Sequence, residues 1–162
     1  MEMKYFSKVS LILFALVLFI FSSCKKKEKY PVEPEISYKQ FDKFGADSAH
    51  IIISFTDGDG DIGLTQSDTV EPYLFNFYTK YFQKKNGVFV EKVLPIPLNY
   101  RIPILNTRSK PHSLSGDIQI TFLKPYYFPT TTKDTVQYEI YIKDRSLHES
   151  NHIITDEIIV GN

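Results

Sequence analysis

Tryptophan is missing from the 162 residues, and cysteine occurs only once, at Cys24. A single cysteine has no partner for an intrachain disulfide. The antibody type of immunoglobulin domain is also excluded, because it depends on a cysteine pair packed against a tryptophan. If the chain forms a β-sandwich, the core must therefore be built without either marker.

Excess charge of one sign is also absent, since 19 Lys and Arg side chains balance 19 Asp and Glu side chains. Proteins that bind polyanions usually carry a basic patch or an excess of positive charge. We therefore expect no nucleic-acid partner.

No apolar run is long enough to span a bilayer as a helix. The longest run, residues 11–21, has 11 residues, whereas a spanning helix needs about 20. It follows a positively charged start and precedes two serines. This order is typical of a secretory signal peptide, which we assign to residues 1–23.

The residues Phe21, Ser22, Ser23 and Cys24 resemble the lipobox of bacterial lipoproteins, although Phe21 stands where leucine is usual. The resemblance implies cleavage before Cys24 and lipidation of that cysteine by a diacylglyceryl group and an N-acyl chain such as palmitate. Two or more acyl chains hold a protein stably on a membrane. The alternative is an ordinary signal peptide with a cysteine near the cleavage site.

Residues 24–35 are charged, contain two prolines and lack apolar periodicity, so we expect a flexible tether. Twelve extended residues reach at most about 40 Å. Lipoproteins that stay in the inner membrane carry an acidic residue after the lipidated cysteine, and here Lys25 takes that place. The expected location is therefore the outer membrane of the cell envelope.

The rest of the chain, residues 36–162, reads as one domain made of short strands. The expected strands are residues 36–41, 49–55, 73–82, 88–93, 100–105, 117–123, 136–142 and 152–160. Asn86-Gly87 lies between two apolar runs and predicts a two-residue hairpin turn. No helix is expected in the mature chain. The pattern predicts an all-β fold, a single antiparallel β-sandwich of immunoglobulin-like or fibronectin type III-like type with seven to eight strands.

An unusual acidic segment, Asp57-Gly58-Asp59-Gly60-Asp61, follows the second expected strand. Three carboxylates at alternate positions can surround a hard cation that prefers oxygen ligands. An EF-hand is excluded, because the positions of its glycine and glutamate hold an isoleucine and an aspartate. A calcium loop of another kind therefore stays a candidate, beside a purely structural turn.

The predicted strand order brings a second loop, residues 143–151, to the same end of the sandwich. Asp144 then joins Asp57, Asp59 and Asp61 as a candidate metal ligand. The alternative is a structural turn, since Asp bonds nearby backbone and Gly accepts positive φ. In that interpretation Ile62 plugs the loop into the sandwich, and a cation such as Arg145 neutralises the carboxylates.

Two of these segments resemble elements of a group of small lipoproteins of Gram-negative bacteria. They are residues 55–64 (FTDGDGDIGL) and residues 144–151 (DRSLHESN), which match an FxDGDGDIGL loop and a DRxxxxSN element. Residues 100–103 (YRIP) are also similar to that group. The group has no assigned activity, so the resemblance implies a fold and a location but no ligand.

Residues 148–152 match the H-E-x-x-H motif of zinc proteases. That motif requires both histidines on one face of a helix. In an extended segment they would lie roughly 13 Å apart, too far to share one zinc ion. The only cysteine is assigned to lipid, and no serine lies in a G-x-S-x-G elbow. We therefore expect no enzyme.

Together these features predict a lipid-anchored β-sandwich that acts as a binding or accessory module, with calcium as a candidate ligand. Its partners would be the membrane, through the lipid on Cys24, and a protein of the cell envelope. The alternative is a structural subunit that docks on an outer-membrane complex and has no ligand of its own.

Overall fold

The computed structural model of the chain describes residues 30–44, 48–105, 112–123 and 133–161. The signal peptide, Cys24 and residues 25–29 of the tether lie outside this part. The strands are β1 (Glu35–Phe44), β2 (Ser48–Asp57), β3 (Phe77–Lys85), β4 (Val88–Glu91), β5 (Leu114–Leu123), β6 (Asp134–Ile142), β7 (Ile153–Ile154) and β8 (Ile158–Val160). Within the described residues, no helix has the length and apolar character needed to cross a membrane.

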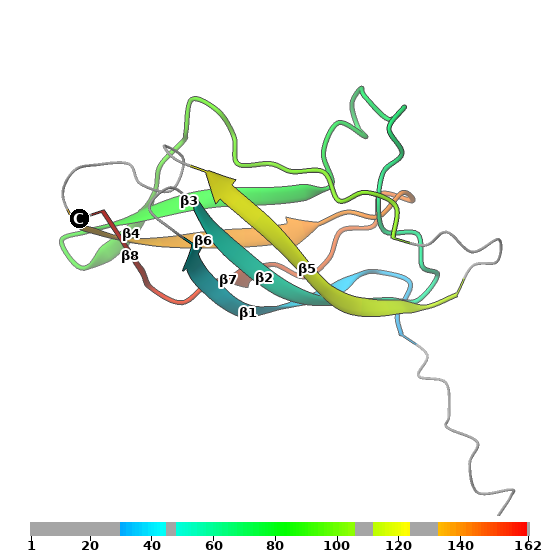
Figure 1. Ribbon diagram of the computed structural model, residues 1–162, viewed down its shortest axis with the longest axis horizontal. Helices are drawn as coiled ribbons and strands as arrows, with labels where there is room; N and C mark the ends of the chain where they lie inside the picture. The colour runs from blue at the N-terminus through cyan, green and yellow to red at the C-terminus, as the bar shows by residue number, and fades with distance from the viewer. Residues whose placement is uncertain (1–29, 45–47, 106–111, 124–132, 162) are drawn as a thin grey trace, which may run out of the picture.

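The strands form two antiparallel sheets that pack together (Figure 1). One sheet has the order β1-β2-β5, and the other has the order β4-β3-β6-β7, with β8 also paired to β6. The prediction of an all-β antiparallel sandwich is thereby confirmed. Its immunoglobulin-like or fibronectin type III-like type stays a prediction.

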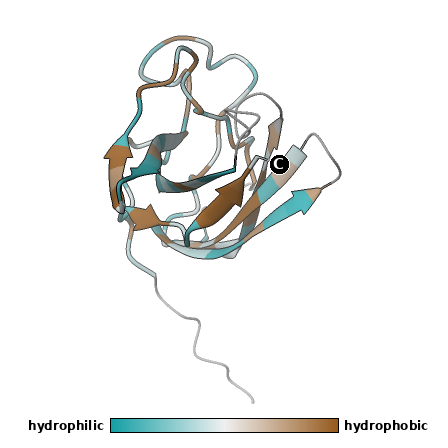
Figure 2. Cartoon of the chain, turned by 90° about the vertical axis from the view of Figure 1, so that its left-hand side faces the viewer, coloured by the Kyte–Doolittle hydropathy of each residue, from teal (hydrophilic) through white to brown (hydrophobic). Residues whose placement is uncertain are grey.

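The core lies between the sheets and is built by alternate residues of the strands. Strands β2 and β6 show this most clearly, since every second residue is buried. The Tyr138 ring of β6 meets Phe41 of β1 at 6.4 Å and Phe122 of β5 at 5.2 Å, centroid to centroid. Aromatic and isoleucine side chains thus fill the space between the sheets, and Figure 2 shows strongly apolar residues concentrated in the strands.

The hairpin between β3 and β4 turns on Asn86 and Gly87, as predicted. Their φ angles are 50° and 82°, and two consecutive positive values are typical of a type I′ turn. This turn fixes the register in which Lys85 pairs with Val88.

The strand predicted over residues 73–82 begins later, at Phe77. The Arg101 guanidinium donates hydrogen bonds to the carbonyls of Tyr73 and Leu74, at 2.9 and 2.8 Å. These carbonyls therefore have a side-chain partner. The predicted start of the strand at residue 73 was wrong, because the distant Arg101 side chain bonds the carbonyls that a neighbouring strand would otherwise bond.

Residues 100–105 form no strand, contrary to expectation. They make two isolated bridges, Phe77 with Tyr100 and Leu64 with Pro103. A proline cannot donate to a ladder. The segment therefore contacts both the loop after β2 and the start of β3 without forming a strand with either.

The last predicted strand, residues 152–160, is divided into β7 and β8. Thr155 lies between them, where its N–H donates to the Tyr138 carbonyl at 3.0 Å. Its hydroxyl accepts from the Tyr138 N–H at 3.1 Å. A side-chain oxygen thus replaces one backbone acceptor of the ladder, and the strand is interrupted at that point.

Candidate functional site

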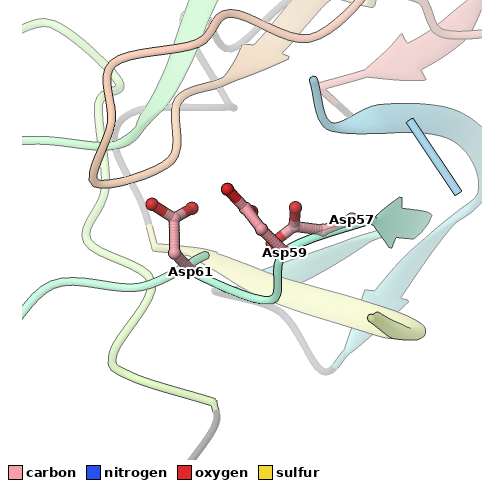
Figure 3. Close-up of side chains that lie close together, drawn as sticks. All are labelled: Asp57, Asp59 and Asp61. Atoms are coloured by element: carbon pink, nitrogen blue, oxygen red, sulfur yellow. The ribbon is translucent and has the colours of Figure 1, made fainter. Parts of the chain in front are cut away.

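The acidic segment begins at the last residue of β2 and continues into the loop toward β3. Asp57, Asp59 and Asp61 each offer a carboxylate oxygen, and these oxygens all lie within 4.8 Å of one another. Figure 3 shows the three side chains on one side of the loop, beneath the loop that follows β6. Ligands of a single calcium ion lie at most about 5 Å apart, since each bond is 2.3–2.6 Å long. The spacing is therefore compatible with one shared cation.

Hydrogen bonds account for only part of this cluster. Asp57 Oδ2 accepts from the Ile62 N–H at 3.1 Å, and Asp61 Oδ2 accepts from the Ser146 hydroxyl at 2.8 Å. The Oδ1 atoms of Asp57, Asp59 and Asp61 are inaccessible to solvent and have no hydrogen-bond partner among the residues that the structure describes. Buried acceptors in proteins are nearly always paired, so these three oxygens call for a cation or a hydrogen-bond donor.

The electrostatic environment of Asp57 also favours a bound cation. Asp57 is fully buried, with 0% of its surface exposed. The pKa of Asp57 is raised to about 6, first by burial and then by the neighbouring Asp59 and Asp61, against the lowering effect of the hydrogen bond from Ile62. Each of these raising causes disfavours a negative charge at this position. A bound cation would reverse that balance.

The turn interpretation of the same segment is confirmed in part. Gly60 and Gly63 have φ angles of 72° and 109°, which favour glycine. Ile62 is fully buried in the core, so it does plug the loop into the sandwich. The structural turn and the candidate cation site thus share the same residues, and the turn leaves the Oδ1 atoms unexplained.

The loop after β6 meets the acidic loop, as the predicted topology requires. The Arg145 guanidinium donates to the Gly63 carbonyl at 3.1 Å, and Ser146 bonds Asp61. Among the contacts of the described residues, Arg145 forms no ion pair with the three aspartates. The prediction that Arg145 neutralises them is therefore wrong, because its guanidinium is held by a backbone carbonyl.

Asp144, the fourth predicted ligand, has its own partners. Its Oδ1 accepts from the His148 N–H at 2.8 Å, and its Oδ2 lies 2.8 Å from His148 Nδ1. Burial raises the pKa of Asp144, against the bonds from His148, and the charge of Asp61 adds to the rise. Asp144 lies outside the group of three, and its role as a ligand stays a prediction.

His148 faces several carboxylates at once. Its hydrogen bond to Asp144 and the charge of that group raise the pKa of His148, and the charges of Glu33 and Asp59 contribute. The N-terminal segment, the acidic loop and the loop after β6 therefore share one electrostatic environment.

Two residues that hold the acidic loop in place were not predicted. Besides Tyr73 and Leu74, Arg101 binds the Thr65 carbonyl at 2.8 Å. The Asn76 amide exchanges two hydrogen bonds with Ile102, whose carbonyl also accepts from the Leu64 N–H at 2.9 Å. The sequence signal that could have indicated this role is Arg101 itself, a single charged residue in an apolar stretch between two prolines.

The end of the loop after β6 is also fixed by side chains. Ser150 Oγ accepts from the Ile142 N–H at 3.0 Å. The Asn151 amide pairs with both the N–H and the carbonyl of Ile36, at 2.8 and 2.9 Å. The serine and asparagine of the DRSLHESN segment therefore join this loop to β6 and to β1.

The H-E-x-x-H segment is not helical, as predicted. His152 lies with its two ring nitrogens 2.9 Å from Glu139 and 2.9 Å from Glu149. His148 instead contacts Asp144. The two histidines thus serve different carboxylates, and they belong to no metal-ligating group among the described residues.

Comparison with protein-family models, with curated proteins and with solved structures finds no match for this chain. The function is therefore inferred from the sequence and from the geometry of the end loops.

Proposed function

We propose that the mature chain is a lipid-anchored β-sandwich lipoprotein of the cell envelope that acts as a binding or accessory module. In this proposal Cys24 carries the lipid in the outer membrane, and calcium orders the loop-bearing end of the domain. The role is not enzymatic. The observation that carries the calcium part is the set of three buried, unpartnered Oδ1 atoms of Asp57, Asp59 and Asp61.

The chemistry of the cluster favours calcium over softer metals. All three candidate ligand atoms are carboxylate oxygens, and hard cations prefer such ligands. Calcium takes six to eight oxygens and tolerates irregular geometry. The Ser146 hydroxyl beside Asp61, backbone carbonyls and water would supply the remaining ones.

A melting experiment with the full chain, purified in detergent, tests the calcium site. After treatment with chelator, calcium at about 100 times its dissociation constant should raise the melting temperature by about 9 °C. Asp59→Asn should abolish the gain, and Asp117→Asn, an exposed aspartate on β5, should leave it intact. A melting curve that ignores calcium and chelator would refute the site.

A second candidate is a structural subunit that docks on an outer-membrane complex. The described part of the N-terminal segment reaches the domain at the end that bears the acidic loop (Figure 1). If Cys24 is lipidated, this arrangement favours a position of that end close to the membrane and to other envelope proteins. Crosslinking in cells should then capture one partner in fixed proportion, and a monomer under all conditions would count against docking.

A further inference from the structure

The N-terminal segment that leads into β1 crosses directly over the acidic loop. A Cβ added at Gly58 would lie 2.4 Å from the Tyr30 carbonyl oxygen and 2.3 Å from that of Pro31. Real Cβ atoms do not approach so closely, so these backbones pack together only because residue 58 is glycine. Pro34 is buried a few residues later. The described part of the segment is therefore seated on the domain.

We call the contact between Gly58 and the N-terminal segment the seat. It lies between two candidate cation ligands, since Gly58 separates Asp57 from Asp59. Three carboxylates held this close repel one another unless a cation or a proton intervenes. An opening of the loop backbone that relieves this repulsion would move Gly58, which lies between two of the three aspartates. The shape of the seat is thus coupled to the state of the cluster.

Charge acts on the segment in the same direction. The charges of Glu33, which lies in this segment, and of Asp59 both act on the His148 ring. Glu33 therefore brings a further negative charge to the end of the domain that bears the acidic cluster. A divalent cation would lower this repulsion and favour the seated segment.

We infer that calcium at Asp57, Asp59 and Asp61 clamps residues 30–34 onto Gly58, and that its loss releases them. This inference rests on the proposed calcium site and on the proposed lipid at Cys24. Released, the tether of residues 24–35 spans at most about 40 Å from the lipid. Clamped, the six residues 24–29 separate the lipid from the clamp, and six residues span at most about 20 Å. Calcium would then set how closely the domain is held to the membrane.

A spin label on Val32, which is 46% exposed, tests the clamp in the full chain purified in detergent. Val32→Cys supplies the reactive thiol, because the sulfur of a lipidated Cys24 is already alkylated. The chain without this substitution is the labelling control. Calcium should remove the mobile component of the spectrum, and chelator should restore it. Calorimetry on the same samples measures calcium binding.

Two variants separate the seat from the cation site. Gly58→Ala keeps all three aspartates but blocks the carbonyls of Tyr30 and Pro31, so calcium should bind while the label stays mobile. Gly116→Ala is the matched control, since its Cβ would meet only the Phe55 ring, at 3.5 Å. If Gly58→Ala does not fold, Glu33→Gln serves instead, and it should reduce the mobile component in chelator.

The outcomes distinguish the two proposals. Calcium binding with an unchanged spectrum would overturn the clamp and leave the calcium site standing. No calcium binding would overturn both. Binding together with loss of the mobile component, abolished by Gly58→Ala, would support both.

Discussion

At the scale of single residues, Asp57 carries a conflict between folding and charge. Its backbone completes β2 and its Oδ2 accepts from the Ile62 N–H, yet its fully buried carboxylate lies beside two others. Burial and these neighbours raise its pKa to about 6. At neutral pH the charged form is therefore held at a cost to stability unless a cation binds.

Asp57→Asn should consequently have opposite effects with and without calcium. In chelator at pH 7.5 the variant should be more stable than the parent by about 1 to 3 kcal/mol, because a buried charge is removed and the acceptor for Ile62 is kept. With saturating calcium the order should reverse. Urea denaturation in both buffers measures this, and a variant less stable in both would contradict the assigned conflict.

His152 provides a pH-dependent contribution on the outer face of β6. Its hydrogen bonds to Glu149 and Glu139 raise the pKa of His152 above its ordinary 6.5. The bond from Lys80 and then the bond from His152 hold the pKa of Glu139 below 4.5, and the bond from His152 does the same for Glu149. The Tyr141 ring stacks on the His152 ring at 4.5 Å. The histidine's contribution is complete below about pH 6.5 and is lost as pH rises through its folded pKa, whereas the glutamates lose theirs only under acid.

His152→Gln should therefore destabilise the protein more at pH 5.5 than at pH 9. The difference should stay below about 1 kcal/mol, because the partly exposed pairs are weakened by solvent. The free energy of unfolding in urea at the two pH values is the measurement. An equal loss at both would assign the effect to the lost stacking on Tyr141.

At the scale of elements, the acidic loop depends on Ile62, which is fully buried beneath the candidate site. Ile62→Ala should cost about 2 to 5 kcal/mol through lost burial and the cavity that remains. Ile159→Ala, at a position 53% exposed on β8, is the matched control and should cost less than about 0.5 kcal/mol. Similar losses in urea denaturation would show that Ile62 does not anchor the loop.

Local patterns predicted those elements whose bonding partners are backbone groups. Strand β6 follows from alternation of apolar residues, β2 follows from a run rich in isoleucine, and the hairpin turn follows from Asn86-Gly87. The starts and breaks that were wrong depend on distant side chains. Arg101 accounts for the late start of β3, and Thr155 accounts for the break between β7 and β8, and no local pattern reports such pairings.

In the candidate site too, features set by local sequence could be predicted and features set by distant contacts could not. Asp57, Asp59 and Asp61 could be predicted because adjacent positions in one loop carry the carboxylates and the glycines. The position of Ser146 beside Asp61 required the strand order as well. The contact of Gly58 with the N-terminal segment could not be predicted, since it depends on a bend of a charged, proline-containing stretch.

At the scale of the whole molecule, attachment is expected to depend on one atom, the Cys24 sulfur. Cys24→Ser should abolish incorporation of labelled palmitate and block cleavage of residues 1–23. The mature lipidated form should then be lost from the outer-membrane fraction. Metabolic labelling and fractionation measure both effects, and a palmitate signal that survives the substitution would contradict lipidation at this residue.

The break between β7 and β8 matters most when many copies share one surface. Strands of two and three residues follow β6 on that side of the five-stranded sheet, and β4, on its other side, has only four. Long, flat, unpaired strands invite neighbours to add on and begin aggregation, and short ones do not. If Cys24 is lipidated as proposed, confinement to a membrane plane would raise the frequency of encounters, and the interruption at Thr155 would then protect a crowded population from sheet-to-sheet growth along this sheet.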